Sequence, residues 1–289
     1  MVNIFNNREI AIIVWLTLII ILFSFKNGVL KSYFELLKAF FQDKIISSVL
    51  ISVIYVELII LFLALFDFWK PDFLKETIFW FLGSAFLLML NSRKALENKS
   101  YFKNIFRDSF KLIILLEFIT NFYSFNLFWE LIIIPLISFI VILDIVAGYK
   151  NEHRAVKKLT QSILSIIGIT LFIFAIKEIF IRSGEFINVD TAKIFLLSII
   201  LTILYLPFLY LFVLYMRYEN LYLRIGFRFD KNDPVFKNIK RRIFLECKLS
   251  LAKLEKLGNT ESINYILNYE DLNSAIDELR GKSPVANNV

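Results

Sequence analysis

Carboxylate and amide side chains occur inside long apolar stretches of this 289-residue chain, where they could line a path for cations. An ionised side chain at the centre of a bilayer costs at least about 2.5–3.5 kcal/mol, so such residues are candidates for function. Glu117, Asn121 and Ser124 follow one another at the spacing of one helix face. Glu130 and Asp144 lie two heptads apart and therefore share a face of a second helix.

These five residues are the candidate pore-lining residues, because rings of Glu and Asp favour cations in a channel. Ile137 lies between Glu130 and Asp144 on the same face and interrupts the polar edge. The alternative is that the carboxylates form hydrogen bonds between helices, or reach the membrane surfaces from the helix ends. The sequence leaves both interpretations open.

Glu57 is a separate intramembrane acid. It lies 12 residues after the start and nine before the end of the apolar run 45–66, or about 18 and 13 Å from the two ends at 1.5 Å per residue. Its helix face is otherwise apolar, with Leu50, Ile54 and Leu61. We therefore expect Glu57 to be protonated or paired across helices.

Catalytic and cofactor motifs are absent from the sequence. It has no glycine-rich nucleotide loop and no hydrolase or metalloprotease motif. One histidine, His153, and one cysteine, Cys247, make a zinc or haem site improbable and exclude an intramolecular disulfide. We expect a protein that is not an enzyme and carries no metal or cofactor.

The elements that position these residues are predicted to be membrane helices, because 58% of the chain is hydrophobic and only 20% is charged. The expected fold is all-α, with about seven transmembrane helices. The apolar runs are 9–25, 45–66, 77–91, 112–126, 128–147, 162–181 and 194–216. The fourth and fifth could instead form a re-entrant pair across 112–147.

Lys and Arg alternate between high and low numbers in successive connections, which the positive-inside rule uses to orient the chain. They number four, two, six, none, four and two, and the tail after residue 216 holds 13. This pattern predicts an outside N-terminus and a cytoplasmic C-terminus. The domains are then a transmembrane part, 1–216, and a cytoplasmic helical tail, 217–289.

Amphipathic patterns at 27–43 and 100–111 predict helices lying on the membrane surface or packed on neighbouring protein.

The tail begins where the last apolar helix is expected to continue past the membrane, and Asp233 and Pro234 then start a new helix. We expect this helix to run to Leu257, ahead of a stop at Gly258. Its predicted buried stripe is Ile239, Ile243, Cys247, Leu251 and Leu254.

A basic cluster lies on this tail helix, and it has the density of a phosphate-binding surface. It consists of Lys237, Lys240, Arg241, Arg242 and Lys248. Contact with anionic lipid is one interpretation. Binding of a nucleotide or DNA oligomer is the other, favoured if the tails of an oligomer gather around one axis.

Four short segments carry a resemblance to a known family: NREIAIIVW at 7–15, WFLGS at 80–84, LEF at 116–118 and NFY at 121–123. In these segments the chain resembles the polytopic membrane effectors of bacterial phage-defence operons, the Hailong effectors among them. The resemblance implies an oligomeric ion channel of the bacterial inner membrane whose non-membrane part binds a DNA oligomer made by a partner nucleotidyltransferase. Release of that oligomer would open the channel and kill the infected cell.

Three functions follow as expectations. The first is a gated cation channel of homo-oligomers, taken as tetramers, with the basic tail as receiver of the signal. The second is a non-conducting membrane scaffold or sensor that recruits a soluble partner through 217–289. The third is a proton-coupled transporter that uses Glu57 as its proton site.

Overall fold

The computed structural model describes residues 5–26, 28–97, 100–110, 124–181, 189–229, 233–259, 263, 266 and 269–279. Within these residues the regular elements are helices, and no strand occurs. Six of the helical segments there are long and apolar enough to cross a membrane. The prediction of an all-α fold with several helices able to cross a membrane is therefore confirmed for the described residues.

The six segments correspond to six of the seven predicted apolar runs. They are α1 (Asn7–Ser24), α3 (Asp43–Leu65), the segment Pro71–Arg93, α9 (Leu127–Ala147), α10 (Arg154–Ile181) and α12 (Val189–Gly226). The fourth run, 112–126, lies almost wholly outside the described residues. The number of crossings, the re-entrant alternative and the orientation stay predictions.

The chain divides into two compact units by packing. The first unit is Met1–Phe73 with Ser109–Ile199, and the second is Leu74–Asp108 with Ile200–Val289. Helix α12 contributes to both units. This division describes how helices pack, whereas the predicted boundary at residue 217 separates membrane from cytoplasm. That boundary stays a prediction.

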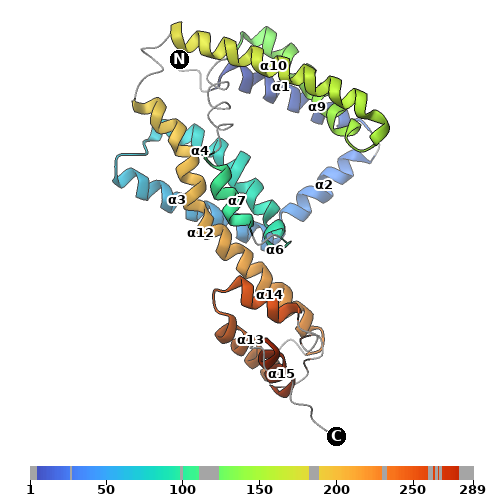
Figure 1. Cartoon of the computed structure of the whole chain (residues 1–289), viewed down its shortest axis with the longest axis vertical. Helices are drawn as coiled ribbons and strands as arrows, with labels where there is room; N and C mark the ends of the chain where they lie inside the picture. Colours follow the sequence, from blue (N-terminus) through green and yellow to red (C-terminus); the bar gives the residue numbers. More distant parts are fainter. Residues whose placement is uncertain are drawn as a thin grey trace. The chain divides into compact units, whose positions relative to one another are not determined.

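In the first unit, α9 packs against both α1 and α10 (Figure 1). Helix α1 begins with a capping box in which the Asn6 side chain accepts from the Glu9 amide and the Glu9 carboxylate accepts from the Asn6 amide. Asn126 caps α9 by accepting from the Trp129 amide at 3.1 Å. The Trp15 indole N–H then donates to the Leu131 carbonyl at 2.8 Å and joins α1 to α9.

The two predicted surface segments are helical, as expected. Helix α2 spans Val29–Phe40 and follows Gly28, whose φ of +83° suits glycine. Helix α7 spans Tyr101–Asp108. The apolar face of α2, with Leu30, Phe34 and Leu37, is exposed. Exposure of this face favours the membrane-surface interpretation for α2.

In the second unit, the segment Pro71–Arg93 contributes α4 (Leu74–Trp80), a π-helical turn, η2 (Phe81–Ala85), and α5 (Phe86–Leu90). It packs on α12 through Trp80, whose indole N–H donates to the Thr202 hydroxyl at 2.9 Å. The same ring meets Tyr205 edge-on at 5.8 Å between centroids. This crossing is longer than the predicted run 77–91, because a first helical turn, η1 (Pro71–Phe73), precedes it.

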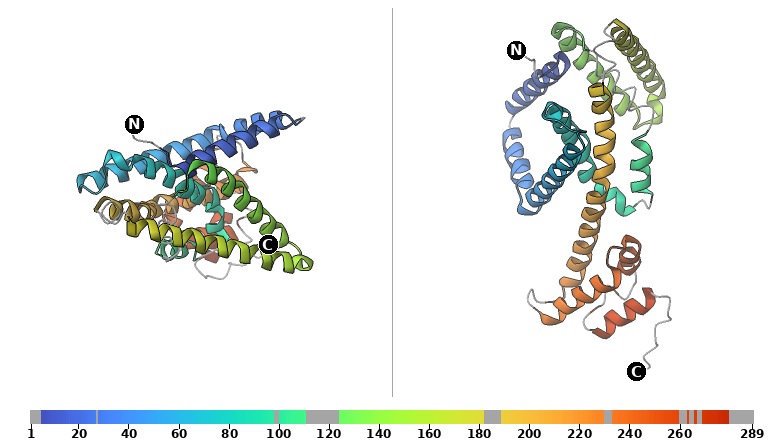
Figure 2. Two further views of the ribbon diagram at one scale, coloured as in Figure 1. Left: turned by 90° about the horizontal axis from the view of Figure 1, so that it is seen from above. Right: turned by 90° about the vertical axis from the view of Figure 1, so that its left-hand side faces the viewer.

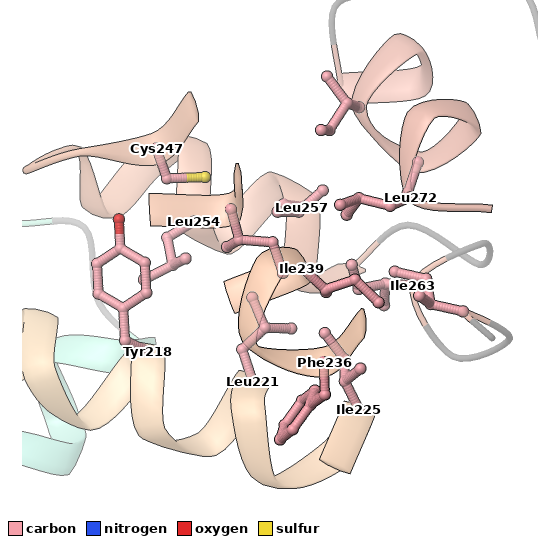
Figure 3. Packing of buried hydrophobic residues seen from close by; sticks show 14 of the residues in the cluster. Tyr218, Leu221, Ile225, Phe236, Ile239, Cys247, Leu254, Leu257, Ile263 and Leu272 are labelled. Atoms are coloured by element: carbon pink, nitrogen blue, oxygen red, sulfur yellow. The ribbon is translucent and has the colours of Figure 1, made fainter. Parts of the chain in front are cut away.

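The tail helices gather around the C-terminal end of α12 (Figure 2). They are α13 (Pro234–Cys247), α14 (Leu251–Asn259) and α15 (Tyr269–Leu279). Asp233 caps α13 as predicted, by accepting from the Val235 amide at 2.7 Å. The predicted stripe is largely confirmed, since Ile239, Ile243, Cys247 and Leu254 are buried and Leu251 is partly buried. These residues pack with Tyr218, Leu221 and Ile225 of α12 (Figure 3).

The prediction of a single helix from Pro234 to Leu257 was wrong, because the helix is interrupted after Cys247. Lys248 adopts a φ of +46°, a conformation that ends a helix. Ser250 then caps α14 by accepting from the Lys253 amide at 3.3 Å. Gly258 lies inside α14 and does not end it. The interruption lets the chain turn while both helices keep their apolar sides in one core.

Cys247 offers a direct test of this core. Burial, with Glu246 nearby, raises the pKa of its thiol from the ordinary value of 9.0 to about 11. We predict that the folded chain at neutral pH reacts with a maleimide at least about 100-fold more slowly than the denatured chain, because the thiolate is the reactive form.

The control is an Asn238→Cys variant, whose new thiol lies on the exposed side of α13. Because the folded-state pKa is raised, the contribution of Cys247 to stability is present below the unfolded pKa and is lost as the pH rises through about 11. Labelling of Cys247 as fast as that of the control would contradict the packing of the tail.

Candidate functional site: membrane carboxylates and the basic tail

The structure describes only part of the predicted pore-lining set. Glu117 and Asn121 lie outside the described residues. Ser124 is half-buried just ahead of α9, and Glu130 and Asp144 lie within that helix. The assignment of these five residues to a pore stays a prediction.

Glu130 is the most completely buried carboxylate in the described part of the chain, with 1% of its surface exposed. The Arg8 guanidinium donates to it from both Nε and Nη2 at 3.3 Å. The Phe125 amide donates to its Oε1 atom at 2.9 Å. Both interactions lie at the first turn of α9, where the helix dipole also favours a negative charge.

Arg8 lies in the first turn of α1, so the Arg8–Glu130 pair joins the N-terminal ends of two membrane helices. The Asn7 side chain adds a bond to the Phe125 carbonyl at 2.9 Å. A buried charge is tolerated when it is paired and hydrogen-bonded in this way. The contacts of Glu130 therefore agree with the alternative in which the carboxylates bind neighbouring helices.

Asp144 joins α9 to α10 near their connection. The buried Thr160 hydroxyl donates to its Oδ1 atom at 2.7 Å. This contact spans 16 residues and closes the hairpin of the two helices. Asp144, like Glu130, makes a specific bond between helices within one unit.

Glu57 differs from the other acids because its side chain is exposed. On the same face, Leu50, Ile54 and Leu61 are also exposed, each by more than half of its surface. The buried residues Ser52, Ile59 and Leu63 of α3 lie on the opposite side of the helix. Within the described residues, Glu57 makes no hydrogen bond or ion pair. An acid in the middle of an apolar face that these residues leave exposed is the arrangement that a bilayer disfavours.

The basic cluster of the tail separates into two kinds of residue. Lys237, Arg241, Arg242 and Lys248 are exposed and available to an anion. Lys240 is half-buried, and its ammonium lies 4.1 Å from the centre of the Phe236 ring. A cation over an aromatic face is stabilised there, so Lys240 contributes to packing of the tail.

Tyrosines of α12 hold the tail, a feature that the sequence analysis did not identify. The Tyr222 hydroxyl donates to the Lys240 carbonyl at 3.1 Å, and that of Tyr218 to the Lys248 carbonyl at 2.7 Å. The Tyr210 hydroxyl donates to the Leu249 carbonyl at 2.6 Å. The order of these contacts shows that α13 runs back along α12. The tyrosines themselves are visible in the sequence, near the end of the apolar run of this helix. The backbone carbonyls to which they bond cannot be identified from the sequence.

Gly226 permits the closest approach between the two helices. A Cβ atom at this position would lie 2.9 Å from the Phe236 ring, closer than such atoms normally come. The ring instead stacks on Phe229 at 5.4 Å. The start of α13 is thereby fixed against the end of α12.

Metal binding finds no support in the described part of the chain, where no three His, Cys, Asp or Glu side chains group as a metal site. His153 lies in the short helix η4 (Asn151–His153), and Cys247 is buried in the tail. The expectation that the protein needs no metal stays a prediction.

Removal of either partner of the Arg8–Glu130 pair tests its role. We predict that Glu130→Ala and Arg8→Ala each lower the free energy of unfolding by about 3 kcal/mol, because each leaves a desolvated group without its partner. The double variant should lose less than the sum of the two, with a coupling above about 1 kcal/mol in a double-mutant cycle.

Thermal unfolding in detergent, followed by the tryptophan fluorescence to which Trp15 of α1 and Trp129 of α9 contribute, supplies the measurement. Glu152→Ala is the matched control, since Glu152 is exposed and lies outside the membrane helices. If the two single losses of unfolding free energy add up to the loss in the double variant, Arg8 and Glu130 do not stabilise the fold as a pair.

Comparison of the chain with protein-family models, curated proteins and solved structures finds no match.

Proposed function

We propose that the chain is a membrane effector of bacterial anti-phage defence that conducts cations as a homo-oligomer and is gated through its C-terminal helices. The observation that carries the proposal is the attachment of α13 and the turn after it to three tyrosines of α12. Helix α12 crosses the apolar stretch and the tail without interruption over 38 residues. A displacement of the tail therefore acts directly on a membrane helix.

Pro207 supports a gating role for α12. It lies within the helix, three residues before Tyr210, and removes one backbone hydrogen bond at that position. Proline is a common cause of bends in helices. A force applied through the tyrosines would thus act next to a point where α12 bends easily.

Glu57 supports an oligomer and a path for cations. Within the described residues of a single copy, its exposed, apolar surroundings offer the carboxylate no hydrogen bond or ion pair. Copies arranged around an axis would bring several Glu57 side chains towards shared water, as a ring of carboxylates of the kind that favours cations. Glu117 and Asn121 remain further candidates for the same path.

The signal is proposed to be a nucleotide or DNA oligomer made by a partner nucleotidyltransferase, as the resemblance implies. The exposed cations Lys237, Arg241 and Arg242 lie on one helix of the tail and match the charge of such a ligand. Its binding or release would change the position of α13 on α12.

A non-conducting membrane scaffold is the second candidate. It is favoured by the contacts of Glu130 with Arg8 and of Asp144 with Thr160, which engage two of the predicted pore carboxylates in packing. In a scaffold, the tail recruits a soluble partner and the membrane potential does not change.

Ion flux in proteoliposomes distinguishes the two. We predict that the full chain carries K⁺ in preference to Cl⁻, and that Glu57→Gln lowers this preference severalfold by removing the charge that attracts cations. The reversal potential in a KCl gradient measures the preference.

Glu152→Gln is the matched control because it removes the same charge outside the membrane helices. Addition of DNA oligomers to the side of the tail tests the gating. A chain that passes no ions with its tail present, occupied or deleted would overturn the channel and leave the scaffold.

A further inference from the structure

We propose that the turn between α13 and α14 is a membrane anchor that binds the headgroup phosphates of anionic lipids. Its surface, here called the turn surface, consists of Leu245, Lys248, Leu249 and Lys253. The inference concerns attachment of the tail to the bilayer, and it stands whether or not the protein conducts ions.

The turn surface lies level with the end of the apolar part of α12. No charged residue occurs in α12 between Lys193 and Arg217. Tyr210 is seven residues before Arg217, which is about 10 Å inside this uncharged stretch. Because its hydroxyl bonds to the Leu249 carbonyl at 2.6 Å, the turn is held beside the apolar end of the helix.

The other end of α13 lies far from that level. Phe236 packs against Gly226, which is 16 residues beyond Tyr210, or about 24 Å along α12. The chain thus leaves the membrane along α12 and returns along α13. Lys248 is the member of the basic cluster brought nearest to the bilayer, and Lys237 is among the farthest.

The chemistry of the turn surface fits an anionic lipid. Leu245 and Leu249 expose 58% and 60% of their surfaces, beside the exposed ammonium groups of Lys248 and Lys253. They border a shallow, open groove between the turn and Tyr210. Glu246 also lines it, so the two lysines leave a net positive charge. Exposed apolar side chains beside cations are typical of segments that lie in the headgroup layer.

Helix α7 also contacts Tyr210, the residue of α12 that holds the turn. Its Phe102 ring lies 5.4 Å from the Tyr210 ring between centroids. Phe106 of α7 is exposed, as are Lys103 and Arg107. A predicted membrane-surface helix and the turn surface therefore meet on one tyrosine, the residue type that is enriched at membrane interfaces.

A lipid surface explains this combination better than a nucleic acid does. A nucleic acid would match the charge of Lys248 and Lys253 but would leave Leu245 and Leu249 in water. Single-strand binding uses aromatic platforms for the bases, and the turn surface presents aliphatic side chains instead.

The depth of residue 249 tests the proposal in the full chain. A Leu249→Cys variant in a Cys247→Ala background carries a fluorescent probe, and the chain is reconstituted with lipids that have a quencher near the headgroup. We expect quenching at least about twofold stronger than for a probe at Asn238→Cys, which lies near the far end of α13. Equal quenching at the two positions would overturn the proposal.

The charge of the lipid is tested with the same probe. Quenching at residue 249 should rise when phosphatidylglycerol replaces part of the phosphatidylcholine, and Lys248→Glu should abolish this rise. Lys237→Glu, the same change at the far end of α13, should preserve it. A rise that survives Lys248→Glu, or that inorganic phosphate or a DNA oligomer reproduces in neutral lipid, would overturn the proposal. Because the readout does not depend on ion flux, a failure of the channel leaves this result interpretable.

Discussion

The return of α13 along α12 is the arrangement on which the rest of the tail depends. Tyr210, Tyr218 and Tyr222 each bond to a backbone carbonyl of α13 or of the turn after it. The rings of Tyr218 and Tyr222 also pack with apolar side chains of the tail. A helix hairpin of this kind needs a core, which the buried residues of α13, α14 and α15 supply. A tail of this size gains most of its stability from packing on a long helix that is already formed.

The same arrangement relates the membrane part to the tail. Helix α12 carries the last apolar stretch and the tyrosines in one continuous element, so the tail is attached to a membrane helix by packing as well as by the chain. In the other unit, Arg8–Glu130 and Asp144–Thr160 fix α9 to α1 and α10. Glu57 is the intramembrane acid that the described part of the fold leaves exposed. The proposed conducting path depends on this difference between satisfied and exposed carboxylates.

Local patterns in the sequence predicted the helices well. Apolar runs located six membrane helices, and Asp233 with Pro234 located the start of α13, because run length and capping act over a few neighbouring residues. The periodicity of Ile239, Ile243 and Cys247 predicted the buried side of that helix. The break at Lys248, where φ is +46°, was missed because its carbonyl accepts from the Tyr218 hydroxyl, 30 residues away, and no local pattern marks that contact. The Arg8–Glu130 pair joins residues 122 apart, and no local pattern records such a contact.

The attachment of the tail to α12 is tested most directly by removing its hydroxyl groups and recording ion flux. In a Tyr210→Phe/Tyr218→Phe variant, the rings and the packing remain but two bonds to the turn after α13 are lost. If the tail gates the membrane part, the flux of this variant in the absence of ligand differs severalfold from that of the parent chain. A Tyr215→Phe control, at an exposed position of the same helix, leaves it unchanged. A double variant with the flux of the parent chain, and with the same response to DNA oligomers, would contradict the account.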